Sequence, residues 1–132
     1  MNDLRRGIAV MNPSTGTTPP WRVRRTLERT ARRAQVDLTI IETEYADHAT
    51  EIVRENAASV DVVVAVGGDG TLSEVVAGAV GHDVTVGIIP TGSTNMVAKD
   101  LGIPRLLGQA AKVALDRESA IVAVDVARAG DT

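Results

Sequence analysis

The stretch that decides the fold is residues 62–74, which read VVVAVGGDGTLSE. Its first five residues are apolar without alternation, which is typical of a strand covered on both faces by helices. Gly67, Gly68 and Gly70 then interrupt the strand, and a helical pattern follows to about residue 80. The stretch therefore predicts a central strand, a tight turn and a helix, in that order.

Apolar runs and helical patterns alternate in the same way on both sides of this stretch. Further strands are predicted at residues 8–11, 38–41, 84–89 and 120–127, and further helices at 20–35, 48–58, 95–101 and 104–116. A regular succession of strands and helices predicts a parallel sheet with right-handed crossovers. We therefore predict an α/β fold, a three-layer Rossmann-like parallel sheet with helices on both faces, as a single domain over residues 1–132.

Composition excludes several classes of protein. The 132 residues are 44% apolar, which is enough for one core, and they contain no cysteine, so a disulfide framework, a zinc finger and a cysteine nucleophile are excluded. Trp21 and Tyr45 are the only aromatic residues, so no nucleic-acid partner is expected, because bases would have nothing to stack on. No apolar run is long enough to cross a bilayer, and the first residues lack a signal-peptide pattern, so we expect a cytoplasmic protein.

The small net charge of −3 hides an uneven distribution. Residues 1–36 carry eight arginines and two acidic residues (8 − 2 = +6), whereas residues 37–132 carry six basic and fifteen acidic residues (6 − 15 = −9). Most of these arginines lie on one face of the predicted helix 20–35. This face is either an ordinary solvated helix surface or a contact for an anionic membrane surface.

Three loops combine glycine with Ser, Thr or Asn, and each follows a predicted strand. They are residues 12–16 (NPSTG), 67–71 (GGDGT) and 90–95 (PTGSTN). The carboxyl ends of parallel strands lie at one edge of a sheet, so we expect these loops to converge there. Their backbone N–H groups and the helix N-termini that follow suit a phosphate group.

Asp69 is unexpected in a loop that suits anions. A carboxylate beside a phosphate implies either a bridging Mg²⁺ or proton acceptance from a hydroxyl, and both belong to phosphoryl transfer. Alternatively, Asp69 stabilises its own turn. Thr71 and Glu74 have the spacing of a capping box, which predicts a helix start at this point, and His48 is interpreted as another helix-start residue.

Other nucleotide and hydrolase motifs do not fit. A Walker loop needs a lysine after glycine, but Lys99 and Lys112 both follow other residues. The dinucleotide fingerprint would end at Ser73 instead of glycine, and no nucleophile elbow surrounds Ser93.

Taken together, the three motifs resemble the N-terminal catalytic domain of diacylglycerol kinases and related lipid kinases, and the resemblance continues through Leu101-Gly102-Ile103-Pro104. It implies transfer of the terminal phosphoryl group of ATP to a lipid hydroxyl, with Mg²⁺ as cofactor. Three positions depart from the residues usual in this family. Ser73 stands where Asn is usual, Met96-Val97 where Asp-Phe or a similar pair is usual, and Thr15 where Ser or Ala is usual.

The resemblance also implies which residues bind. Asp69 would be catalytic and would hold Mg²⁺ together with Asp125. The residues that would contact ATP are Asn12, Pro13, Ser14, Thr15, Gly16, Thr43, Gly67, Gly68, Asp69, Gly70, Thr71, Leu72, Ser73, Glu74, Gly92, Ser93 and Asn95.

The lipid acceptor would bind in a second, β-rich domain of the same polypeptide. Since residues 1–132 do not include such a domain, we expect this chain alone to be nearly inactive. Two other functions remain open: an NAD-kinase-like phosphotransferase, which would use a similar GGDGT loop, and a non-catalytic nucleotide-binding module.

Overall fold

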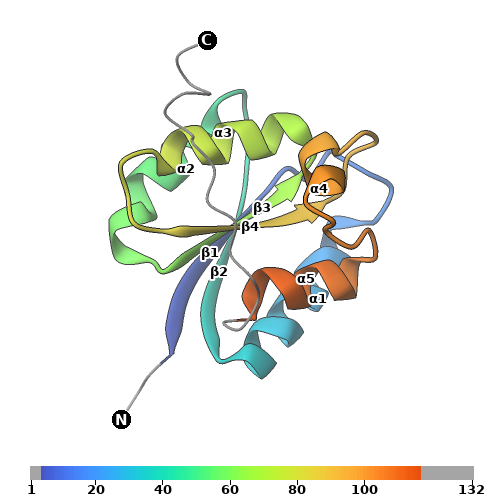
Figure 1. Ribbon diagram of the computed structural model, residues 1–132, viewed down its shortest axis with the longest axis horizontal. Helices are drawn as coiled ribbons and strands as arrows, with labels where there is room; N and C mark the ends of the chain where they lie inside the picture. Colours follow the sequence, from blue (N-terminus) through green and yellow to red (C-terminus); the bar gives the residue numbers. More distant parts are fainter. Residues whose placement is uncertain (1–3, 117–132) are drawn as a thin grey trace.

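The computed structural model describes residues 4–116. Strands and helices alternate along them, as the apolar patterning predicts (Figure 1). The strands are β1 (Arg5–Met11), β2 (Val36–Glu42), β3 (Val62–Gly67) and β4 (Thr85–Pro90); the helices are α1 (Pro20–Ala34), α2 (His48–Asn56), α3 (Asp69–Ala79), α4 (Met96–Asp100) and α5 (Leu107–Leu115), with a 3₁₀ turn at Ala57–Ser59. The predicted strand 120–127 and Asp125 lie outside the described residues.

In the described part of the chain the four strands form one parallel sheet in the order β2-β1-β3-β4. The chain moves outward from β1 to β2 and then returns past β1 to β3, so the strand order reverses between β1 and β3. In open α/β sheets, ligands bind at such a reversal, beyond the carboxyl ends of the strands. Every residue of β3 is buried, which confirms that residues 62–66 form a central strand.

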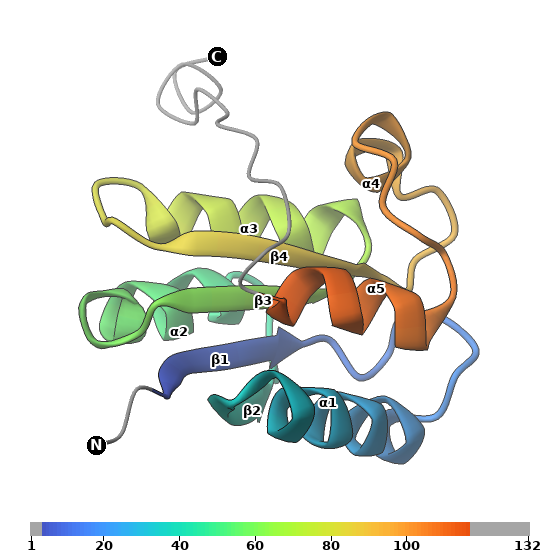
Figure 2. The same ribbon diagram turned by 60° about the horizontal axis from the view of Figure 1, so that its bottom comes forward.

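Helices cover both faces of the sheet, as the three-layer prediction requires (Figure 2). Val62, Val64 and Val66 of β3 pack in one core cluster with α1 and α5, whereas Val63 and Ala65 pack in the other with α2 and α3. Burial of each valine side chain contributes roughly 1.5–3 kcal/mol to folding. The unbroken apolar run of β3 therefore contributes side chains to the hydrophobic cores on both faces of the sheet.

Helix α1 matches its prediction to within one residue. Pro20 stands at its start, and Val23, Leu27 and Ala31 are buried at helical spacing. Gln35 ends the helix in the left-handed conformation, with φ 58°, and its N–H bonds to the last carbonyls. The arginines of α1 consequently lie on the outer side.

The predicted capping box is wrong. Helix α3 begins at Asp69, two residues before Thr71, and Gly68 precedes it without a side-chain cap. The Glu74 carboxylate instead accepts a hydrogen bond from the Ala49 N–H, 3.3 Å away at the start of α2. Glu74 therefore stabilises a neighbouring helix, because α2 and α3 pack side by side.

The boundaries of the other helices lie within three residues of the prediction. Asp47 precedes α2 in the left-handed conformation, with φ 67°, and makes no side-chain cap, so His48 is the first helical residue as predicted. Helix α2 ends at Asn56 and continues only as a 3₁₀ turn. Helix α4 ends at Asp100, and α5 begins at Leu107, three residues after Pro104. Between residues 4 and 116, no helix has the length and apolar character needed to cross a membrane.

Candidate functional site

The three loops singled out in the sequence leave the same edge of the sheet, at the right of Figure 2. The Asn12 N–H donates to the Val66 carbonyl at 3.0 Å, and the Thr91 N–H donates to the Gly67 carbonyl at 2.9 Å. These bonds extend the pairing of β1 with β3, and of β3 with β4, into the loops. The loops therefore start side by side at the point where the strand order reverses.

Contacts between the loops hold them together beyond the strand ends. The hydroxyl oxygens of Thr15 and Thr91 lie 2.9 Å apart in a hydrogen bond that spans 76 residues of sequence. Gly16 has φ 79°, and a Cβ placed on it would collide with the Thr91 carbonyl oxygen. A Cβ on Gly92 would lie only 2.7 Å from the Gly68 Cα atom. Glycine is therefore needed where these backbones meet.

Asn12 shapes the first loop from within. Its Oδ1 atom accepts hydrogen bonds from the Ser14 N–H at 3.0 Å and the Ser14 hydroxyl at 2.6 Å. The Asn12 carbonyl accepts the Thr15 hydroxyl at 3.0 Å. The loop is thus a preformed turn, with Ser14 exposed and Pro13 half-buried.

Asn95 closes the third loop in a comparable way. It is left-handed, with φ 50°; its Oδ1 accepts the Gly92 N–H at 3.1 Å, and its Nδ2 donates to the Gly92 carbonyl at 2.7 Å. The Gly92 N–H is therefore engaged inside the loop. Ser93 lies exposed at the loop tip.

Asp69 joins two elements at this edge. It lies in the first turn of α3, where the helix dipole favours a negative charge, and it is half-buried. Its Oδ2 atom accepts the Met96 N–H at 3.1 Å, at the start of α4. Oδ1 has no hydrogen-bond partner among residues 4–116. Asp69 consequently holds a neighbouring helix rather than its own turn.

A small pocket lies between the ends of β3 and β4 and the starts of α3 and α4. Both apolar and polar residues line it. The lining residues are Ala65, Gly67, Gly68, Asp69, Leu72, Ile88, Pro90, Asn95 and Ala98. The first hydrogen bond within α3 runs from the Leu72 N–H to the Gly68 carbonyl. The N–H groups of residues 69–71, at this pocket, are therefore not used inside the helix.

Not all candidate residues gather at this pocket. Thr43 follows β2, on the far side of β1 from β3, and its N–H donates to the Met11 carbonyl at 2.9 Å. Thr71 is buried, while Gly70 and Ser73 are exposed on α3. The carboxylate of Glu74 lies at the start of α2, as described above.

Two groups at this edge are absent from the sequence-based set of site residues. The Thr91 hydroxyl bridges two loops, and the Met96 N–H binds Asp69. Thr91 lies within the 90–95 motif, so its hydroxyl was a detectable signal. The Met96 N–H is a backbone group, and no side-chain pattern identifies it.

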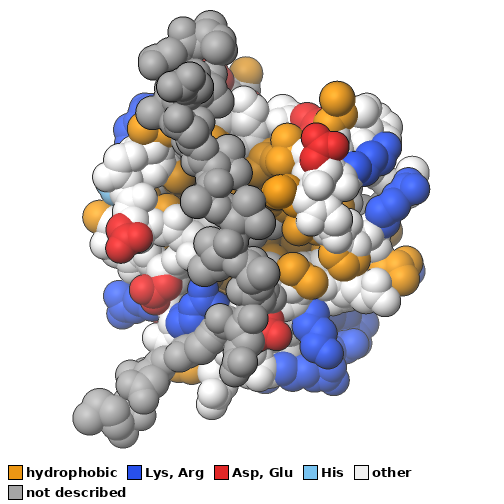
Figure 3. Space-filling model, in the orientation of Figure 1, with side chains coloured by type: hydrophobic (Ala, Val, Ile, Leu, Met, Phe, Trp, Pro, Cys, Tyr) orange, Lys and Arg blue, Asp and Glu red, His pale blue; other side chains and the backbone are white. Residues whose placement is uncertain are grey.

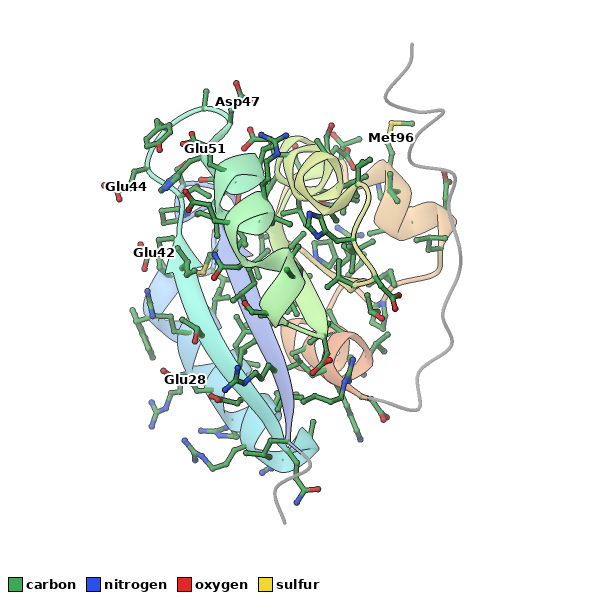
Figure 4. The ribbon with its side chains drawn as sticks, turned by 90° about the vertical axis from the view of Figure 1, so that its left-hand side faces the viewer. Glu28, Glu42, Glu44, Asp47, Glu51 and Met96 are labelled. Atoms are coloured by element: carbon green, nitrogen blue, oxygen red, sulfur yellow. The ribbon has the colours of Figure 1, made fainter. Side chains whose placement is uncertain are left out.

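The β2 side of this edge is acidic. Figure 4 shows Glu42 and Glu44 at the end of β2, with Asp47 and Glu51 around the start of α2. Glu42 forms an ion pair with Arg24 at 2.9 Å. An anionic ligand is therefore favoured over β1, β3 and β4, away from β2.

Tyr45 lies beside these acidic residues. Partial desolvation, together with the Glu51 carboxylate 3.2 Å from the Tyr45 hydroxyl, raises the pKa of Tyr45 above 10.0.

The three loops themselves contain no lysine or arginine. Among the residues that the structure describes, no cluster of three or more His, Cys, Asp or Glu side chains could hold a metal ion. This edge therefore offers a ligand backbone N–H groups, hydroxyls, a helix N-terminus and one carboxylate. This set suits an anion that brings its own cation.

Comparison with known proteins gives a consistent picture. Residues 6–129 match the family model of the diacylglycerol kinase catalytic domain. A diacylglycerol kinase of Bacillus subtilis is 34% identical over 105 residues, which cover 77% of this chain and 35% of the relative. A probable lipid kinase YegS-like protein of Citrobacter koseri is 36% identical over 91 residues, which cover 66% of this chain and 28% of that protein.

Solved structures agree with the sequence matches. The crystal structure of a diacylglycerol kinase from Bacillus anthracis superimposes with a TM-score of 0.76 at 28% sequence identity. The match covers 86% of this chain and 42% of the other chain. This chain therefore spans less than half the length of these relatives.

Proposed function

This chain belongs to the diacylglycerol kinase catalytic domain family, and from that membership we propose that it is the ATP-binding half of a lipid kinase. The observation that carries the proposal is the convergence of three glycine-containing loops where the strand order reverses, fixed by the contact between Thr15 and Thr91. The rest of the active site would come from a second domain of the same polypeptide. The chain alone would then have almost no activity.

The phosphates of ATP would lie over the ends of β1, β3 and β4. Gly68 and Gly92 let the second and third loops pack closely together there, and the first N–H groups of α3 are available as donors. The partial positive charge at the N-terminus of α3 favours a phosphate. Ser93, exposed at its loop tip, would contribute a hydroxyl donor. Acidic groups on the β2 side would keep the phosphates away from that strand.

Asp69 fits a Mg²⁺ ion that arrives with the nucleotide. Mg²⁺ is commonly held by one or two carboxylates together with phosphate oxygens, and the Oδ1 atom of Asp69 makes no hydrogen bond within the described residues. When bound, the ion would offset the charge of the transferring phosphoryl group. Asp69 would keep its orientation through the Met96 N–H, and loop N–H groups would stabilise the phosphate oxygens.

The acceptor would be a lipid hydroxyl such as that of diacylglycerol. Its oxygen would attack the γ-phosphorus of ATP in line, the bond from that phosphorus to the β–γ bridging oxygen would break, and ADP would leave. The hydroxyl proton would pass to a general base supplied by the second domain. The enzyme would act from the cytoplasm as a peripheral membrane protein. Arg25, Arg29 and Arg32, exposed on the outer side of α1, would attract an anionic membrane surface.

The test uses the full-length protein that contains this chain. We expect it to transfer the labelled γ-phosphoryl group of ATP to diacylglycerol in detergent micelles and to leave NAD unlabelled. Asp69→Asn is expected to lower turnover by about a hundredfold or more, because the fixed charge that faces the phosphates is lost. Asp83→Asn, an exposed carboxylate in the turn before β4, is the matched control and should keep full activity.

Labelled NAD without labelled lipid would refute the lipid acceptor. Normal turnover by the folded Asp69→Asn protein would refute the role of Asp69.

A further inference from the structure

Helix α4 and the turn after it display four large apolar side chains to solvent. Met96 is 61% exposed, Val97 42%, Leu101 39% and Leu106 66%. We call these four residues the apolar knuckle. Single exposed apolar residues are ordinary, but four within eleven residues form a concentrated surface of the kind that marks an interaction site.

The exposure follows from how α4 is attached. Ala98 is the one buried residue of this helix, and α4 stands apart from the helices that cover the sheet (Figure 2). Val97 and Leu101 lie four positions apart and therefore share a face. Figure 4 shows Met96 projecting away from the body of the molecule. These side chains are turned outward while Ala98 packs inward.

Hydrogen bonds fix this arrangement. The Met96 N–H is held by Asp69 at 3.1 Å, and the Ile103 N–H donates to the Ala98 carbonyl at 2.9 Å. Gly102 turns the chain with φ 72°, and its N–H donates to the Lys99 carbonyl at 3.1 Å. The knuckle is therefore a defined feature of the fold.

Basic side chains border the knuckle. Lys99 and Arg105 are exposed within the same segment, against a single exposed acid, Asp100. Figure 3 shows Lys and Arg side chains next to hydrophobic ones in the region of α4. Apolar side chains flanked by long basic ones suit a lipid surface, since the apolar groups enter the interface while the charges stay at the phosphate level.

We propose that the apolar knuckle inserts into the interfacial layer of an anionic bilayer and anchors the loop edge of the sheet there. The inference rests on the proposed function, because a lipid kinase meets its acceptor at a membrane. The Asp69 carboxylate accepts the Met96 N–H, so insertion of the Met96 side chain would bring the phosphate-binding loops to the membrane surface. The five-residue helix is far too short to span, which limits insertion to the interface.

The absence of cysteine from the chain permits a direct test by site-specific labelling. Met96→Cys and Leu106→Cys proteins each carry an environment-sensitive fluorophore at the new thiol. Val80→Cys is the matched control, because Val80 is 49% exposed at the end of α3 remote from the loops. We expect a blue shift at positions 96 and 106 on addition of phosphatidylcholine–phosphatidylglycerol vesicles, little shift with phosphatidylcholine alone, and none at position 80.

Vesicle sedimentation measures the strength of the anchor. The Met96→Ser/Leu106→Ser double variant should partition about tenfold more weakly than the unmodified chain, because two apolar anchors are lost. Val80→Ser should partition normally. MgATP binding by each variant is measured in parallel, so that a failure of nucleotide binding, which concerns the proposed function, is distinguished from a failure of anchoring.

Three results would overturn the inference. The first is an emission shift at position 96, on addition of anionic vesicles, that is no larger than the shift at position 80. The second is loss of binding only when Arg25, Arg29 and Arg32 are reversed in charge, with the knuckle variant binding normally. The third is a blue shift at position 96 that depends on protein concentration without lipid, which would mean that a second copy covers the knuckle.

Discussion

Asp69 connects the start of α3 to the start of α4, because its Oδ2 atom accepts the Met96 N–H at 3.1 Å. An alanine at this position would remove that bond together with the charge, so its effect on activity would be difficult to interpret. Asparagine is closer in shape and retains an oxygen that accepts the same bond. Asp69→Asn therefore isolates the contribution of the charge.

We predict that Asp69→Asn has opposite effects on two forms of ATP. Binding of MgATP to the chain should weaken by about tenfold to a hundredfold, since a contact to a charged group is worth about 1.5–3 kcal/mol. Binding of ATP in excess EDTA should become stronger, because the repulsion between the carboxylate and the phosphates is removed. Isothermal titration calorimetry of both forms checks this, with Asp83→Asn as the control.

Equal changes in affinity for the two forms of ATP would argue against a metal-mediated role. A large fall in melting temperature would mean that Asp69 serves mainly to hold α4.

Tyr45 offers a second test at the scale of one residue, since it is the only tyrosine and its ionisation is visible by absorbance near 295 nm. Partial desolvation and the nearby Glu51 raise the pKa of Tyr45 above 10.0. Glu51→Gln should lower that pKa back toward 10.0, whereas Glu28→Gln, on α1, should leave it unchanged.

Because the folded state raises this pKa, the associated stabilisation is present below about pH 10 and decreases as the pH rises through the folded-state pKa. A Tyr45 pKa that does not respond to Glu51→Gln would contradict the contact.

At the scale of elements, the two glycines of α3 have different surroundings. A Cβ on Gly78 would lie 2.7 Å from the Thr50 carbonyl oxygen and 2.8 Å from the Val53 Cβ atom, both on α2. A Cβ on Gly70 would meet nothing within 4 Å. Gly78 therefore permits the close packing of α2 and α3, whereas packing does not require glycine at position 70.

We predict that Gly78→Ala destabilises the fold by about 1–3 kcal/mol, because the added methyl group overpacks the contact between α2 and α3. Gly70→Ala should instead stabilise it by up to about 1 kcal/mol through helix propensity. Gly70→Ala should also weaken MgATP binding by about tenfold, since a methyl group would stand among the first N–H groups of α3. Urea unfolding and calorimetry measure the two effects.

Gly108→Ala is the control, because this glycine of α5 also has open space around it. Unchanged MgATP affinity in Gly70→Ala would place the phosphates away from α3.

Elements whose pattern is carried by their own residues could be predicted from the sequence. The unbroken apolar run of β3 predicts a strand buried on both faces, and the spacing of Val23, Leu27 and Ala31 predicts α1. The convergence of the loops follows from the parallel order of the strands. The family itself is carried by the three loop motifs, and residues 6–129 match its model.

Contacts between distant residues could not be predicted. The capping box was a local interpretation, but Glu74 bonds to the Ala49 N–H, 25 residues away, because α2 packs against α3. The bond between Thr15 and Thr91 likewise depends on loops that meet only after the sheet has formed. Sequence spacing carries no information about such partners.

For the molecule as a whole, strand order concentrates the chemistry at one edge. The order β2-β1-β3-β4 places the loops after β1, β3 and β4 together, and the acidic end of β2 bounds them on one side. The apolar knuckle lies on the other side, next to Asp69. Under the proposed function, this edge would bind phosphate between the acidic border and the apolar knuckle.

Nuclear magnetic resonance of the ¹⁵N-labelled chain, titrated with MgATP, tests most directly whether a nucleotide binds at this edge. We predict that the largest amide shift changes occur at residues 12–16, 68–72 and 91–95. Residues 57–61 and 80–84, at the opposite ends of the strands, should keep their shifts. The largest changes at that opposite edge, or none at any position at saturating MgATP, would contradict the account.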